Sequence, residues 1–126
     1  MITHITIGAK DKASSAAFYE AVLGTIGYKK AMDMERFTGF SAGDGQPIIL
    51  VGAPHEGEAT FGNGTMIGFH ADSRAKVDHA HAAGLKAGGA DEGAPGPRDT
   101  GPPNTYAAYL RDPTGNKIGV FCFAPA

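Results

Sequence analysis

The chain has little cysteine and no long apolar run, and each scarcity excludes a class of protein. Its single cysteine, Cys122, rules out an intrachain disulfide framework and a cysteine-based zinc cluster, and suits a reducing cytoplasm. No apolar run approaches the roughly 20 residues of a membrane span, and Met1 leads directly into a strand-like segment, so we expect neither membrane insertion nor a signal peptide. The 11 Lys and Arg, against 13 Asp and Glu, are scattered, which argues against nucleic-acid binding.

Glycine and proline are abundant, with 19 and 8 residues among the 126 of the chain. Residues that reverse or interrupt the chain at this density favour many short strands and turns over long helices. The length is sufficient for one hydrophobic core, and it leaves little room for a second. We therefore expect one domain, 1–126.

The first half predicts a strand, a helix and three further strands. Residues 2–7 alternate isoleucine with His and Thr, as a strand with one packed face does. Asp11 precedes an amphipathic helix over 13–23, and Gly24 ends it. Three strand-like segments follow, with a glycine turn at 43–45 between the last two, at residues 26–34, 35–42 and 46–51. The polar, glycine-rich stretch that follows, 53–63, reads as a linker.

The second half repeats this order. A strand over 65–70 precedes a helix over 74–83, which Asp72 or Ser73 caps and Gly84 ends. The later segments predict a short strand over 85–92 and then a loop over 93–103, whose prolines cannot donate hydrogen bonds to a neighbouring strand. Two further strands follow, over 104–111 and 117–123, and the turn 112–115 joins them. Laying Gly45 on Gly115 aligns the two halves, so we infer an internal duplication with module one at about 1–52 and module two at about 64–126.

Two phrases carry a family likeness: Ala17-Phe-Tyr-Glu-Ala-Val-Leu-Gly24 at the end of the first helix, and Leu110-Arg-Asp-Pro-Thr-Gly-Asn-Lys-Ile118 around the last turn. With His4 and Asp11, they resemble the glyoxalase/bleomycin-resistance/extradiol-dioxygenase superfamily, also called vicinal oxygen chelate proteins. The resemblance implies an α+β fold in which two tandem βαβββ modules form a curled mixed sheet around a cavity. It also implies a homodimer and, in most members, a divalent metal ion in that cavity.

The family holds its metal ion with His or Glu on the first and last strand of each module. The resemblance places those positions at His4, Ile49, Met66 and Gly119. Ile and Gly offer no donor, a thioether is a soft ligand, and one imidazole cannot replace three or four ligands. We therefore expect no metal ion and no other cofactor.

The remaining site candidates come from strand alternation. His4 would line the cavity as a ligand contact or general base, or else donate one hydrogen bond to a neighbouring strand. Thr6 shares its face, and Met66 and His70 lie on the matching face of the second module, although His70 near the strand end is equally expected to be solvated.

Further candidates lie in the Pro/Gly loop and the strand after it. Arg98, beside Asp99, would pin an anion at the cavity mouth or form a surface pair. Tyr106 and Tyr109 must point to opposite faces, and we expect Tyr106 in the cavity and Tyr109 in the core. Elsewhere, His79 and His81 are expected on a solvated helix face.

Two functions remain open. The first is metal-independent binding of a small molecule in the sheet cavity, since most of the metal ligands are absent. The second is a lyase, isomerase or dioxygenase acting on a small oxygenated substrate with His4 in its active site. The sequence leaves open whether the protein is an enzyme.

Overall fold

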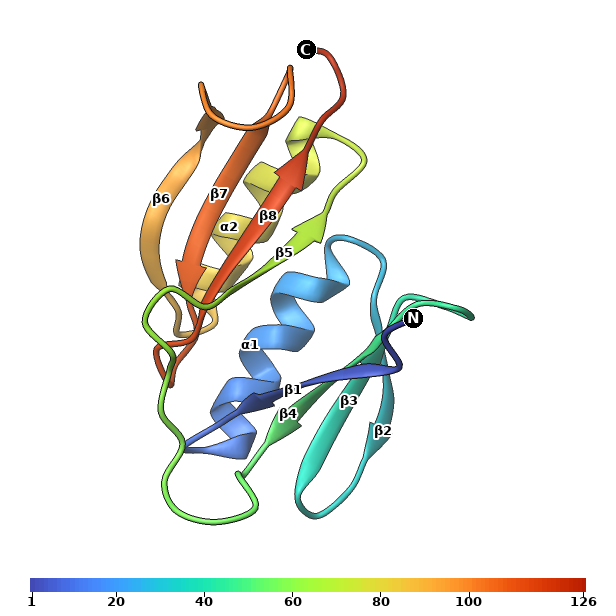
Figure 1. The fold of residues 1–126 in the computed structure, drawn as a ribbon, viewed down its shortest axis with the longest axis vertical. Coiled ribbons are helices and arrows are strands. Elements are labelled where there is room, and N and C mark those ends of the chain that lie inside the picture. Colours follow the sequence, from blue (N-terminus) through green and yellow to red (C-terminus); the bar gives the residue numbers. More distant parts are fainter.

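The computed structural model describes residues 1–126, and the order of elements within it is duplicated (Figure 1). The first half contains β1 (His4–Gly8), α1 (Lys12–Gly24), β2 (Lys29–Asp33), β3 (Phe37–Ser41) and β4 (Ile48–Gly52). The second half contains β5 (Met66–His70), α2 (Arg74–Lys86), β6 (Ala90–Pro97), β7 (Tyr106–Arg111) and β8 (Lys117–Cys122). The predicted α+β fold with two tandem modules is confirmed.

Each half forms its own mixed four-stranded sheet, with the order β1-β4-β3-β2 in the first and β5-β8-β7-β6 in the second. The first strand of each sheet pairs in parallel with the last, and the other neighbours are antiparallel. Neither sheet closes, so β1 and β5 are edge strands. Figure 1 shows the two edges facing one another where the halves meet.

A single hydrophobic core joins the halves. Each helix packs on one face of its own sheet, and the two helices contact one another. Phe18, Val22 and Leu23 of α1 and Val77 and Ala80 of α2 are buried in one cluster with the inward side chains of both sheets. The opposite face of each sheet is left uncovered within the chain, and we call these the open faces.

Helix α1 begins at Lys12, one residue before the predicted start, and Asp11 caps it, because its carboxylate accepts from the Ser14 amide at 3.1 Å. Ser73 rather than Asp72 caps α2 and accepts from the Lys76 amide. The prediction that Gly84 ends α2 is wrong, since the helix continues to Lys86. Gly84 is instead a packing residue: a Cβ there would lie 2.6 Å from Leu110 Cδ1.

The predicted loop over 93–103 is also wrong in its first half, because β6 extends through Pro97. Pro95 and Pro97 are tolerated because β6 is the outer strand of its sheet, paired only with β7, and its register shifts around Gly93. The irregular segment is reduced to the residues between Pro97 and Tyr106.

Neither helix of the protein is long and apolar enough to cross a membrane.

The predicted linker contains no helix or strand, but it does more than connect the halves. Ala59 is buried, and a Cβ at Gly8 of β1 would touch it at 3.4 Å. This segment therefore packs along the edge of β1 and contributes to the site between the halves.

Candidate functional site

The open face of the second sheet has a continuous aromatic surface. Tyr109 of β7 meets Phe121 of β8 edge to face, with ring centroids 5.7 Å apart, and Phe121 stacks against Phe123 at 6.1 Å. These residues alternate with Ala108, Leu110, Val120 and Cys122, which point into the core. Beside the rings lies an open groove of about 330 Å³, lined by Met66, Gly68, Phe69, His70, Phe121 and Phe123.

Met66 and His70 thus lie where strand alternation predicted, on the open face of β5. Met66 is 40 % exposed and forms one end of the groove, and His70 lies at the other end of the strand. The groove is largely apolar, so burial of an apolar ligand surface is the main driving force that it offers. His70 supplies a hydrogen-bonding imidazole beside it.

The assignment of the two tyrosines was the reverse of the structure. Tyr106 points to the helix side, where its hydroxyl donates to Asp78 of α2 at 2.6 Å and the Arg74 guanidinium lies 4.9 Å from its ring. The hydrogen bond to Asp78 raises the pKa of the Tyr106 hydroxyl. Tyr109 is the residue on the open face. Strand alternation requires the two tyrosines to point to opposite faces of the sheet, but the packing of α2 decides which one faces inward.

Arg98 reaches the open face at the Tyr109 ring. Its guanidinium carbon lies 5.4 Å from the ring centroid, and its Nη2 donates to the Ala94 carbonyl at 2.7 Å. A second cation, Lys117 Nζ, lies 5.1 Å from the same ring. Sequence reasoning missed Lys117, Phe121 and Phe123, although the alternation of the two phenylalanines with buried Cys122 was a signal for one exposed aromatic face.

The first sheet presents His4 and Thr6 on its open face, with Met32 and Leu50 beside them. Both His4 and Thr6 are exposed, and the hydroxyl of Thr3 lies 2.9 Å from His4 Nδ1. That contact leaves Nε2 of His4 without a protein partner. The structure therefore places His4 and Thr6 on one open face and Met66 and His70 on the other, and it does not bring the four together within one chain.

The assignment of Ile49 to a family metal position was wrong by one residue. Ile49 is buried in the core, and Leu50 is the β4 residue on the open face, paired with Thr6 as Gly119 is paired with Gly68. The connection from β3 to β4 is one residue longer than that from β7 to β8, which shifts the alignment of Gly45 with Gly115. The correction adds no donor, because a leucine replaces an isoleucine.

The residues at the four family positions do not fit a divalent ion. His4 supplies the one good donor, and no group of three or more His, Cys, Asp or Glu side chains converges anywhere in the chain. At Gly119 there is no room for a metal-ligating side chain, since a Cβ there would lie 2.5 Å from Phe121 Cε1. An aromatic ring thus occupies the space into which a carboxylate at this position would project.

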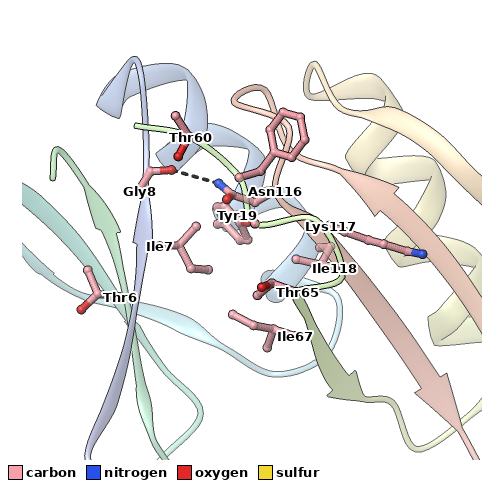
Figure 2. A pocket seen from close by; sticks show the side chains of 12 residues that line it. Thr6, Ile7, Gly8, Tyr19, Thr60, Thr65, Ile67, Asn116, Lys117 and Ile118 are labelled. Carbon is pink, nitrogen blue, oxygen red and sulfur yellow. Dashed lines mark hydrogen bonds between the residues drawn. The ribbon is translucent and has the colours of Figure 1, made fainter. Parts of the chain in front are cut away.

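A second cavity, of about 190 Å³, lies where the edges of β1 and β5 face one another (Figure 2). Thr6, Thr60 and Thr65 line it with the linker residue Phe61, over a floor of isoleucines and Tyr19. Figure 2 shows Asn116 reaching across to the Gly8 carbonyl, a 2.9 Å hydrogen bond, while the Lys117 side chain points away. Sequence reasoning missed Thr60, because the linker has no periodicity to place it, and Thr65, which was expected within a strand but precedes β5.

His81 is another correction. It is buried rather than solvated, and its Nε2 lies 2.9 Å from Asp91 Oδ1 at the start of β6. The hydrogen bond from His81, with one from the Gly93 amide, lowers the pKa of Asp91. The pair ties α2 to the outer strand behind the aromatic surface and takes no part in either cavity. His79 is exposed, as expected.

Comparison with known proteins agrees with this architecture. The model of the Glyoxalase/Bleomycin resistance protein/Dioxygenase superfamily matches residues 1–120. The chain is similar in structure to a glyoxalase/bleomycin resistance protein from Albidiferax ferrireducens T118, with a TM-score of 0.86 and 36 % identity over 97 % of this chain and 98 % of that one. Among curated proteins no match is found.

More distant solved structures share the fold. A glyoxalase/bleomycin resistance protein/dioxygenase family enzyme from Burkholderia phytofirmans PsJN has a TM-score of 0.73 at 20 % identity, over 97 % of this chain and 98 % of that one. Lactoylglutathione lyase from Agrobacterium tumefaciens has a TM-score of 0.66 at 22 % identity, over 96 % of this chain and 92 % of that one. The chain belongs to the glyoxalase/bleomycin resistance protein/dioxygenase superfamily.

Proposed function

We propose that this protein binds a small molecule on the open faces of its sheets without the help of a divalent metal ion. The observation that carries the proposal is at Gly119, where glycine stands at a family ligand position and the Phe121 ring fills the space that a ligating side chain would need. Of the other family positions, Leu50 has no donor and Met66 offers only a thioether. His4 alone cannot hold a catalytic ion.

The open face supplies the chemistry that a metal-free site needs. The groove of about 330 Å³ beside Phe121 and Phe123 has the size of a small ligand, and its walls are mostly apolar. Burial of ligand surface against these walls provides affinity, while His70, Lys117 and Arg98 surround the rings with groups that orient polar atoms. This combination of apolar walls and peripheral polar groups supports the proposal of a binding site.

We also propose that the protein is a homodimer in which the open face of one sheet covers that of a second copy. Met66 and Phe123 are 40 % and 42 % exposed on the second sheet, and nothing within the chain covers them. Pairing unlike sheets of two copies would bring His4 and Thr6 opposite Met66 and His70 and complete a shared cavity. Light scattering at micromolar concentration tests this, and a monomeric mass would contradict it.

The binding proposal is tested by elemental analysis and thermal shift on protein purified without chelator. We expect less than one-tenth of an equivalent of zinc, nickel or iron, and we expect fragments to raise the Tm equally with and without EDTA. Stoichiometric metal that is lost in His4→Ala would contradict the proposal. So would fragment binding that disappears in EDTA and returns with a divalent ion.

A second candidate function, catalysis with His4, rests on the contact of Thr3 with Nδ1 of that ring. In the tautomer in which Nδ1 donates to the Thr3 hydroxyl, Nε2 is an unprotonated acceptor, which is the arrangement of a general base. Superfamily reactions on small oxygenated substrates, of the lyase, isomerase or dioxygenase type, are the ones to assay. Turnover of such a substrate that is abolished in His4→Gln, with binding retained, would establish this function in place of simple binding.

A further inference from the structure

A row of three glycines and one tyrosine crosses the second sheet. Gly68 of β5 pairs with Gly119 of β8, Gly119 pairs with Tyr109 of β7, and Tyr109 pairs with Gly93 of β6. Three of the four positions across the whole width of the sheet are therefore glycine. A row of this kind leaves a shallow trough on the open face, since no Cβ rises from the backbone at those three positions.

Two aromatic rings lie over this trough. A Cβ at Gly93 would meet Tyr109 Cδ2 at 2.7 Å, and a Cβ at Gly119 would meet Tyr109 Cδ1 at 3.2 Å, so opposite edges of the Tyr109 ring rest on the two glycines. The Phe121 ring extends over the other part of the row, 2.5 Å from a Cβ at Gly119 and 3.1 Å from one at Gly68. The glycines thus hold both rings close to the sheet, and Phe121 borders the open groove.

The two charged side chains nearest the Tyr109 ring are both cations. Arg98 and Lys117 both lie within 5.5 Å of the Tyr109 centroid, and neither takes part in a salt bridge. Glu92, an acid of the neighbouring β6, is paired with Arg111 at 3.2 Å, and its pKa is lowered mainly by this hydrogen bond and further by the charges of Arg111 and Lys117. Two cations that form no salt bridge therefore flank the aromatic rings of the open face.

We infer that this surface recognises planar aromatic anions, such as aromatic carboxylates. The ring system of such a ligand packs against the Phe121 and Tyr109 rings, and its carboxylate is placed where Lys117 and Arg98 can donate to it. A cationic ligand of the same shape is repelled, and a neutral one leaves both cations unpaired. The inference rests on the proposed function, since it names the class of ligand for the same open face.

The test uses three probes of one shape and different charge: 2-naphthoate, 2-naphthamide and 2-(aminomethyl)naphthalene. Isothermal titration calorimetry on the full chain at pH 7 measures their affinities. We expect 2-naphthoate to bind about tenfold more tightly than the amide and the cation not to bind. Raising the salt concentration should weaken the binding of the naphthoate and leave that of the amide unchanged.

Four variants locate the site. Arg98→Gln and Lys117→Gln should each weaken naphthoate binding by about fivefold, as expected for an exposed ion pair, without changing amide binding. Arg74→Gln is the matched control for the first, because Arg74 lies over Tyr106 on the helix side of the same sheet. Lys86→Gln, at the end of α2, is the control for the second. The melting temperature of each variant verifies its folding.

The outcomes separate this inference from the proposed function. Equal binding of the naphthoate and the amide overturns the anion class, while metal-free binding on the open face stands. An absence of binding by all three naphthalenes, with other fragments raising the Tm, overturns the aromatic class and again leaves the proposed function standing. If no fragment binds at all, both fail. Equal loss of naphthoate affinity in the control variants would also overturn the assignment to this surface.

Discussion

The hydroxyl of Tyr19, in the middle of α1, donates to Oδ2 of Asp112 in the β7–β8 turn at 2.7 Å, across 93 residues of sequence. Both residues are buried. Oδ1 of the same carboxylate accepts from the amides of Thr114, Gly115 and Asn116, each at 2.9 Å. The two phrases that carry the family likeness therefore meet in one structural joint between the halves, away from the open faces where a ligand would bind.

Replacing Tyr19 with phenylalanine tests this joint. The substitution removes one donor from a buried carboxylate and leaves the ring packing unchanged, so we expect a loss of about 1.5–3 kcal/mol in the free energy of unfolding. Urea denaturation measures it. The control is Tyr28→Phe, because burial alone raises the pKa of Tyr28 and no partner is lost there. Equal effects in the two variants would show that the bond to Asp112 contributes nothing specific.

The same joint predicts instability at alkaline pH. Burial, followed by the charge of Asp112 and the hydrogen bond to it, raises the pKa of Tyr19 well above 10.0. The unfolded chain therefore loses this proton at a lower pH than the native protein does. The stabilisation is complete below pH 10 and declines as the pH rises from there toward the native pKa. Tyr19→Phe should show a shallower decline than the parent in urea titrations between pH 9 and 11, and parallel profiles would contradict this.

Two helical glycines should respond to alanine with opposite signs. Gly84→Ala places a methyl group 2.6 Å from Leu110 and 3.0 Å from Val22, and overpacking there should exceed the gain in helix propensity, for a net loss of about 1–2 kcal/mol. Gly24→Ala meets nothing within 4 Å at the end of α1 and should gain up to about 1 kcal/mol. Thermal unfolding of both variants compares them, and a gain at Gly84 would refute the close approach.

The His81–Asp91 pair predicts a dependence on acid pH. The hydrogen bond from His81 holds the pKa of Asp91 below its ordinary value of 3.8, so this carboxylate contributes stability above pH 3.8 that is lost as the pH falls through the lower native value. Asp91→Asn should therefore lower the Tm at pH 6 by a few degrees or less, since Asp91 is exposed, and the difference should vanish in strong acid. A Tm difference that is independent of pH would contradict the assignment.

The order of elements and their duplication were predictable because they depend on local physics. Asp11 caps α1 through a bond to an amide three residues away, and the turn at 112–115 is closed by its own Asp112. Such interactions form wherever the local sequence allows them. The open-face positions of His4, Thr6 and Met66 followed from alternation along strands whose inner side is marked by isoleucine and phenylalanine.

Tertiary packing decided which side chains reach the open face of the second sheet. Strand alternation places Tyr106 and Tyr109 on opposite faces of the sheet but does not say which face each one takes. Only the packing of α2, with Asp78, selects Tyr106 for the helix side. Gly84 is a typical helix stop in sequence, and it became a packing residue because Leu110 and Phe18 approach it from other elements. Pro95 and Pro97 entered a strand because β6 needs no hydrogen bonds on its outer edge. In each case the deciding contact comes from residues distant in sequence, which a local pattern does not contain.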